Sequence, residues 1–167
     1  TGITMPDGGS LKLFGEDQRE DHRDQIGYMP EQRGLYRKLT VREQLEYFGA
    51  LKGLSAPRLS QAIDHWLRRF EITSWSKKKT SELSKGMQQK LQFIVTLLHD
   101  PELVVLDEPL SGLDPVNAEI INEVILELRA AGKTIILSTH RMEQVDQLCD
   151  EIAMMDQGAI VLAGSVR

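Results

Sequence analysis

The sequence predicts an α/β fold, in which a mostly parallel sheet carries an inserted all-helical region. Two continuous apolar runs, "ELVVLDEP" and "KTIILSTH", are typical of parallel strands that are buried on both faces. The amphipathic stretch "DPVNAEIINEVILELRAAGK" separates them, and a strand–helix–strand unit of this kind forms a right-handed crossover. Upstream, the pattern is helical from about Lys38 to Leu98. We therefore expect a core made of residues 1–37 and 99–167, and a helical subdomain made of residues 38–98.

The elements nearest the N-terminus are short. The glycine-flanked stretch "DGGSLKLFGED" predicts one short strand, and "QIGYMPEQ" predicts a second one that ends at Pro30. Between them, "REDHRDQ" has the composition of a solvated charge run. His22, His65 and His99 lie in polar or helical settings, and we expect them to be solvated as well.

Capping signals mark the helices of the inserted region. Thr40 and Glu43 have the spacing of a capping box at the start of the first helix. Ser55 and Pro57 start the second helix, and Ser84 caps the third.

Similar signals bound the elements of the C-terminal part. Asp114 caps the crossover helix, Pro115 occupies its first turn, and Gly132 follows its end. A short helix is expected from about Arg141 to Leu148. Two further strands, "EIAMMD" and "AIVLAG", follow it and are joined by a turn at Gln157–Gly158.

Composition limits the function. The chain of 167 residues has a formal net charge of −5, which argues against a nucleic-acid partner, because such a partner favours a basic face. Cys149 is the only cysteine, which excludes a disulfide framework and a cysteine-based metal site. No apolar run reaches the roughly 18 residues that span a bilayer, so we expect a cytosolic protein. "TGITMPDGG" has the pattern of a helix end that enters a turn, and the chain stops after an apolar strand, so we expect a fragment of a longer protein.

Ser84, Lys85 and Gly86 open the third predicted helix and form a candidate anion site. The backbone N–H groups and the dipole at a helix start favour a negative charge. Gly86 would allow close approach of a phosphate, the Ser84 hydroxyl offers a hydrogen bond, and Lys85 adds positive charge. An ordinary capped helix is the alternative, because such caps are common.

Asp107 and Glu108 end an apolar strand and are candidates for phosphoryl-transfer chemistry. In nucleotide hydrolysis one carboxylate holds Mg²⁺, usually through water, while its neighbour orients or deprotonates the attacking water. Successive side chains of a strand point in different directions, so adjacent acids can take separate roles. A solvated turn is the alternative. His140 ends the next strand, at the edge where α/β sheets bind ligands, and could hydrogen-bond a γ-phosphate or the attacking water.

The order and spacing of these features resemble the ATP-binding subunit of ABC transporters. "LSKGMQQ" is similar to the signature helix of that family, "VVLDEP" to its Walker B strand, "SGLD" to its D-loop and "STH" to its switch histidine. "GYMPEQRGLY" looks like its Q-loop, and the chain is most similar to the ATPases of bacterial ABC-2-type exporters, including sodium-extrusion pumps. The resemblance implies an incomplete RecA-like P-loop NTPase core with an inserted α-helical signature subdomain.

The resemblance also implies cofactors and a role for each matching residue. The cofactors are ATP and Mg²⁺, and the catalytic residues are Glu108 and His140. The resemblance assigns nucleotide binding to residues of the signature helix and the D-loop, which are Ser84, Lys85, Gly86, Gln88 and Asp114. The metal would be held by Asp107, together with Glu31 or Gln32.

Three departures from the family pattern stand out. Lys85 and Met87 replace a glycine and a glutamine of the usual signature, LSGGQ, and Glu31 falls where the Q-loop has glutamine, with Gln32 beside it. The chain also contains no glycine-rich loop ending in Gly-Lys-Ser/Thr, the Walker A loop, which in the family precedes the segment that starts here at Thr1. We therefore expect the fragment alone to lack a central strand, to bind ATP poorly and to be inactive.

The resemblance implies two partners: an ABC transmembrane permease subunit, and a second nucleotide-binding domain in a head-to-tail dimer. It implies a cytoplasmic protein at the inner face of the cell membrane, where ATP-driven dimerisation and hydrolysis drive export. Three alternatives stay open at this point: a soluble ABC-type ATPase, a non-catalytic interaction module, and a chain that pairs with itself to fill the missing strand.

Overall fold

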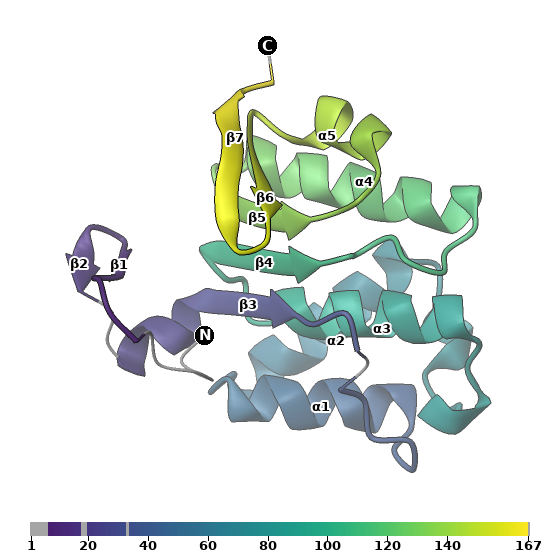
Figure 1. Cartoon of the computed structure of the whole chain (residues 1–167). Helices are drawn as coiled ribbons and strands as arrows, with labels where there is room; N and C mark the ends of the chain where they lie inside the picture. The colour runs from purple at the N-terminus through teal and green to yellow at the C-terminus, as the bar shows by residue number, and fades with distance from the viewer. Residues whose placement is uncertain (1–6, 18–19, 33, 167) are drawn as a thin grey trace.

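The computed structural model describes residues 7–17, 20–32 and 34–166 (Figure 1). Residues 1–6, where the sequence suggested a helix end, and Arg19 of the charge run lie outside the described residues. The parallel sheet has the strand order β3–β4–β5, which are Ile26–Met29, Leu103–Asp107 and Thr134–Ser138. Two antiparallel hairpins complete the strands: β1 (Lys12–Leu13) with β2 (Glu16–Asp17), and β6 (Glu151–Asp156) with β7 (Ala159–Ser165).

Helices flank the parallel sheet on two sides. In Figure 1, α1–α3 gather on the side of β3, whereas α4 and α5 lie on the side of β5. The α-helices are α1 (Val41–Leu51), α2 (Ala56–Arg69), α3 (Lys85–Leu97), α4 (Pro115–Ala130) and α5 (Met142–Leu148). Short 3₁₀ helices lie at Glu20–Gln25, Thr73–Trp75 and Thr80–Glu82.

The structure confirms the predicted capping residues. Thr40 Oγ1 accepts a hydrogen bond from the Glu43 N–H, and the Glu43 carboxylate accepts one from the Thr40 N–H at 2.8 Å, which completes the capping box of α1. Ser84 and Asp114 cap α3 and α4, each through a bond from a backbone N–H of the first turn. Ser55 occupies the N-cap position of α2, although its side chain makes no capping bond.

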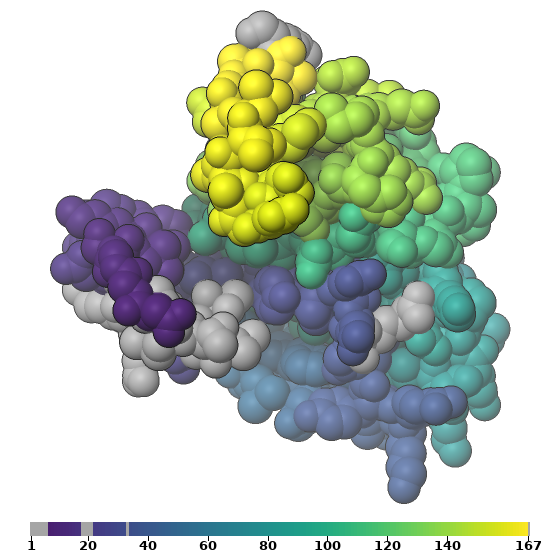
Figure 2. Space-filling view, in the orientation of Figure 1, coloured from purple at the N-terminus to yellow at the C-terminus, as the bar shows by residue number. Residues whose placement is uncertain are grey.

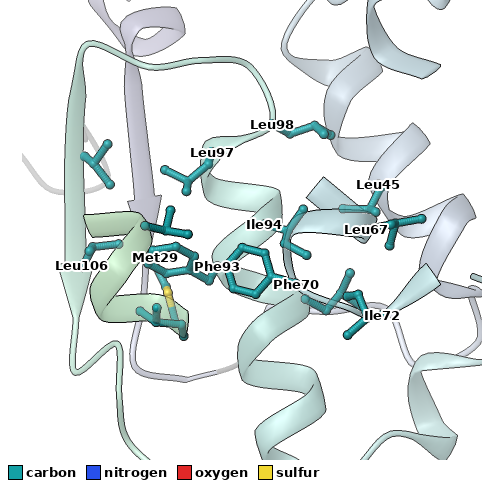
Figure 3. Packing of buried hydrophobic residues seen from close by; sticks show 14 of the residues in the cluster. Met29, Leu45, Leu67, Phe70, Ile72, Phe93, Ile94, Leu97, Leu98 and Leu106 are labelled. Atoms are coloured by element: carbon teal, nitrogen blue, oxygen red, sulfur yellow. The ribbon is translucent and has the colours of Figure 1, made fainter. Parts of the chain in front are cut away.

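A buried apolar cluster joins α1–α3 and α4 to the parallel sheet. Phe93 of α3 lies between Met29 of β3 and Phe70, which follows α2, and the centroids of the two phenylalanine rings are 5.8 Å apart (Figure 3). Val104 and Leu106 of β4 belong to the same cluster and are almost fully buried. Because the cluster runs through both predicted parts of the chain, the division into a core and a helical subdomain stays a prediction.

The expectation that β5 is buried on both faces is wrong. Thr134, Ile136 and Ser138 are exposed, and 56% of the Ile136 surface is accessible. The physical reason is the position of β5, because it is the last strand of its sheet and α4 packs on one face of it. Within the described ranges, no strand pairs with its second edge.

Two of the three histidines expected to be solvated are not. His22 is only 3% exposed, because the turn of the β1–β2 hairpin brings the Phe14 ring edge-on against its imidazole, with the centroids 5.7 Å apart. His99 is partly buried, and its Nε2 lies 3.1 Å from the carbonyl oxygen of Ile26. His65 is exposed, as expected.

The β6–β7 hairpin stands at one end of the molecule, coloured yellow in Figure 2. Its predicted turn at Gln157–Gly158 is confirmed, and both residues have positive φ values. Large apolar side chains of the hairpin face solvent: Met154, Met155, Ile160, Val161 and Leu162. No helix in the described part of the chain is long and apolar enough to cross a membrane.

Candidate functional site

The carboxyl ends of β3, β4 and β5 lie at one edge of the sheet, because the three strands are parallel and in register. This edge brings together segments that are far apart in the sequence. Asp107 and Glu108 end β4, Ser138 ends β5 directly opposite Asp107, and His140 follows two residues later. The sheet therefore places the predicted metal ligand and both predicted catalytic residues side by side.

Ser138 holds the two acids in position. Its hydroxyl donates a hydrogen bond of 2.5 Å to Oδ1 of Asp107 and accepts one of 3.2 Å from the backbone N–H of Glu108. These bonds orient the Asp107 carboxylate and anchor the backbone that carries Glu108. Sequence reasoning named the string around Ser138 but gave this serine no role. The register of two parallel strands, which pairs it with Asp107, is the signal that identifies it.

Glu108 and His140 form a close pair. Nδ1 of His140 lies 2.7 Å from Oε1 of Glu108, and the same oxygen accepts the backbone N–H of His140 at 3.1 Å. When Glu108 is ionised, Nδ1 carries the hydrogen and Nε2 is left as an acceptor. The side chain of Glu108 is 21% exposed and that of His140 is 75% exposed, so a ligand or a water molecule can reach the pair.

The backbone of Glu108 is held in an unfavourable conformation. Its φ of 48° lies in the left-handed region, which residues other than glycine rarely adopt. Such a conformation costs about 1–3 kcal/mol and is concentrated at functional sites. Hydrogen bonds stabilise it: the Glu108 N–H donates to the Ser138 carbonyl, and the Ser111 N–H donates to the Glu108 carbonyl.

The start of α3 has the features of the predicted anion site. Ser84 Oγ accepts the N–H of Met87 at 3.2 Å, so part of its hydrogen-bonding capacity serves the cap. Lys85 is exposed. A Cβ on Gly86 would lie 3.3 Å from Cδ2 of Leu113, so the glycine lets the loop before α4 approach the helix closely. The nucleotide contact predicted for these residues stays a prediction.

Gln88 and Asp114 bind their own chain. The Gln88 side-chain amide donates to the carbonyls of Thr80 and Leu83, at 3.2 and 3.0 Å. The Asp114 carboxylate accepts the backbone N–H of Asn117 at 3.1 Å and its side-chain amide at 2.5 Å. These two bonds lower the pKa of Asp114, so it caps α4 as a carboxylate. The local role of both residues is clear, and their predicted nucleotide contact is untested.

Glu31 and Gln32 lie in a pocket between the segment after β3 and the start of α3. The pocket has a volume of 590 Å³. Its polar lining includes Glu31, Gln32, Arg37, Lys85, Gln88 and Ser111. Four predicted site residues therefore line this pocket, which are Glu31, Gln32, Lys85 and Gln88, whereas Asp107, Glu108 and His140 lie at the sheet edge. Ser84, Gly86 and Asp114 do not belong to the lining of the pocket.

The acids near the sheet edge form no closed metal cage. Among the described residues, no group of three or more His, Cys, Asp or Glu side chains is placed to hold a metal ion. Mg²⁺ typically keeps several waters and is bound by one or two carboxylates together with substrate phosphates. The single oriented carboxylate of Asp107 fits such an ion, which takes most of its ligands from water and nucleotide.

A parallel sheet with an acid pair and a histidine at its carboxyl edge is the arrangement of a nucleotide-hydrolysing α/β protein. Residues 1–111 match the family model described as ABC transporter. The chain belongs to this family, as an ATP-binding domain.

Relatives agree with this assignment. The chain is 45% identical over 166 residues to an uncharacterized ABC transporter ATP-binding protein of Alkalihalophilus pseudofirmus, with 99% of the chain and 62% of the relative covered. It is 37% identical to the Nod factor export ATP-binding protein I of Rhizobium sp. (strain N33), covering 98% of the chain and 55% of the relative. It is 34% identical to the ABC transporter ATP-binding protein NatA of Bacillus subtilis, covering 98% and 68%.

A solved structure of the ATP binding subunit of an ABC transporter has the same fold. It is 30% identical, superposes with a TM-score of 0.90, and is matched over 98% of this chain and 70% of its own. The chain spans 53–62% of the length of three of the curated relatives that it matches.

Proposed function

We propose that the protein containing this chain is the ATP-hydrolysing subunit of an ABC exporter. The observation that carries the proposal is the Glu108–His140 pair, fixed beside Asp107 at the carboxyl edge of a parallel sheet. Two relatives support the ATPase class and one of them supports export, since it is a Nod factor export ATP-binding protein.

In the proposed mechanism, Glu108 orients the attacking water and accepts its proton. His140 holds the Glu108 carboxylate through Nδ1. Its Nε2 would accept a hydrogen bond from the attacking water in the neutral ring, and would donate one to a γ-phosphate oxygen in the protonated ring. Asp107, together with Glu31 or Gln32, would hold Mg²⁺ through water. Bound Mg²⁺ neutralises the charge that develops on the phosphates. Ser138 keeps both acids oriented before the nucleotide arrives.

The proposed site is completed by two further parts. A phosphate-binding loop and its strand would lie beside β5, where the second edge of the strand and the Ile136 side chain are exposed. Ser84, Lys85 and Gly86 would contact the nucleotide of a second nucleotide-binding domain in a head-to-tail dimer, together with Gln88 and Asp114. The exposed position of Lys85 at the start of α3 suits a contact made between two chains.

The proposed membrane partner is a permease subunit, which would dock beside the segment after β3. Tyr36 lies in this segment and contacts two aromatic rings of α1, with centroid distances of 5.2 Å to Tyr47 and 6.0 Å to Phe48. Tyr36 is 51% exposed, so the cluster offers apolar area next to the pocket that holds Glu31 and Gln32. Docking there would place the protein at the inner face of the membrane. The net charge of −5 disfavours a nucleic acid as partner.

Replacing Glu108 with glutamine tests the proposal in the full-length protein. Glu108→Gln keeps the size of the side chain but removes the base, so we expect ATP binding to persist and kcat to fall by about 10²–10⁴-fold. Glu119→Gln, at an exposed position of α4, is the matched control and should keep wild-type kcat. Unchanged turnover in Glu108→Gln would contradict the role of Glu108.

A further inference from the structure

Two buried glutamines of α3 are directed at the strand ends that carry the site. Gln89 and Gln92 are 2% and 4% exposed, and a spacing of three residues places them on one face of the helix. Gln89 Nε2 donates to the carbonyls of Glu108 and Pro109, at 3.3 and 3.0 Å. Gln92 Nε2 donates to the carbonyl of Pro30 at 2.6 Å.

These three carbonyls lie just beyond the strands. β4 ends at Asp107 and β3 at Met29, so the sheet ladder does not supply donors to the residues that follow. A buried carbonyl must find a donor elsewhere. Helix α3 provides one for Pro109 and for Pro30, the residue preceding Glu31. It also gives the Glu108 carbonyl a second donor besides the Ser111 N–H, at the turn that holds Glu108 in its left-handed conformation.

The arrangement leaves one buried acceptor without a partner. Among the described residues, no donor reaches Oε1 of Gln92. An apolar side chain of similar size would avoid this unpaired atom, and unpaired buried polar atoms are rare in folded proteins. The free-energy cost of the unpaired Oε1 indicates that the bond from Gln92 Nε2 to the Pro30 carbonyl positions Glu31 and Gln32, in addition to its part in packing the core.

We propose that Gln89 and Gln92 are positioning residues for ATP hydrolysis, which fix Glu108 and the Glu31–Gln32 pair relative to helix α3. This inference rests on the proposed ATPase function. The N-cap residue of the same helix is Ser84, about 7.5 Å from Gln89 along its axis at 1.5 Å per residue. Helix α3 therefore links two predicted sites. Its start, at Ser84, would contact the nucleotide of a second domain, and Gln89 holds Glu108, which would activate water at the nucleotide of this domain.

The test compares steady-state ATP hydrolysis by variants of the full-length protein. Gln89→Met and Gln92→Met keep the length of the side chain and remove the donor. We expect kcat to fall at least about tenfold for Gln89→Met and several-fold for Gln92→Met, with KM for ATP within about twofold, because misplaced catalytic groups lower turnover more than binding. Thr96→Val is the control, since it removes a buried hydrogen bond of the same helix, from Thr96 Oγ1 to the Gln92 carbonyl, without touching the strand ends.

A conservative variant adds a readout that a purely structural role would not produce. An ionised carboxylate cannot donate to a carbonyl, whereas a protonated one can. Gln89→Glu should therefore match Gln89→Met at pH 8 and regain activity relative to wild type as the pH falls toward 6. Equal pH profiles for the two variants would contradict the proposal.

The other possible results of these measurements also test the proposal. Unchanged kcat in either methionine variant, or a loss no larger than that of Thr96→Val, overturns the proposal. If Gln89→Met does not fold, Gln92→Met decides alone. If the wild type hydrolyses no ATP, the proposed function fails. Amide hydrogen exchange then tests whether Gln89 holds the turn at Glu108 in place. The Ser111 amide, which donates to the Glu108 carbonyl, should exchange faster in Gln89→Met than in wild type, and an equal rate would overturn the inference.

Discussion

The two sides of the parallel sheet differ in how their apolar side chains are covered. On the side of α1–α3, Phe93, Met29 and Leu106 are fully buried within one continuous cluster. On the other side, Ile121, Val124 and Ile125 of α4 are buried in the same cluster, but Ile136 of β5 and the apolar residues of the β6–β7 hairpin face solvent. Both regions have similarly apolar sequences, so the difference arises from neighbours and not from composition.

The comparison indicates which part of the chain is structurally complete. On the α1–α3 side, described residues cover the apolar side chains that point at the sheet, although Leu51 and Tyr47 of α1 are exposed on its outer surface. β5 and β6 belong to separate sheets, and each has an edge that pairs with no described strand. A strand added beside β5 would pair its free edge, and a helix following that strand would cover the face that carries Ile136. This is the place we propose for the phosphate-binding segment.

The largest expected difference is in the free energy of unfolding when an apolar side chain is truncated on each side of the sheet. Phe93→Ala leaves a cavity in a packed cluster, and we expect the free energy of unfolding of the chain to fall by about 3–5 kcal/mol. Ile136→Ala, at an exposed position, should lower it by less than about 0.5 kcal/mol. Urea unfolding followed by circular dichroism measures both. In the full-length protein the cost of Ile136→Ala should rise to about 2 kcal/mol or more, and a cost that stays small would exclude a segment that covers this face of β5.

The affinity for ATP should differ between the 167-residue chain and the full-length protein. Without a phosphate-binding loop, we expect the affinity for Mg-ATP to be at least about 100-fold weaker, which corresponds to about 2.7 kcal/mol, and hydrolysis to be nearly absent. Isothermal titration of both proteins measures the difference. Micromolar binding by the isolated chain would show that the described residues suffice.

The smallest expected effect is on the pH dependence of the melting temperature, through His99, which is partly buried just after the end of α3. Burial, and then the charge of Lys52, lower the pKa of His99, so His99 takes up a proton more readily in the unfolded chain than in the folded one. Its contribution to stability is present above the unfolded value of about 6.5 and is lost as the pH falls below it. The melting temperature should therefore drop less between pH 7.5 and 5.5 in His99→Gln than in wild type. His65→Gln, at an exposed position, should retain the wild-type slope; equal slopes in all three proteins would contradict this.

Local signals in the sequence predicted the elements well, because caps and turns depend on neighbouring residues. The capping box at Thr40 and the turn at Gln157–Gly158 are examples. The exposed face of β5 was not predictable from its own residues, because burial depends on which elements cover a strand. The roles of Ser138 and Gln89 were missed for a similar reason, since both depend on contacts between segments at least 19 residues apart in the sequence.

The backbone at Glu108 has a consequence for the evolution of this protein. Glycine would adopt a φ of 48° without strain, so stability alone would favour glycine at this position, and the proposed catalytic role is a reason to keep the acid. A gene copy released from the need to turn over nucleotide would gain by replacing Glu108 with glycine. Among related sequences, glycine at this position would therefore mark lineages that have abandoned catalysis while keeping the fold.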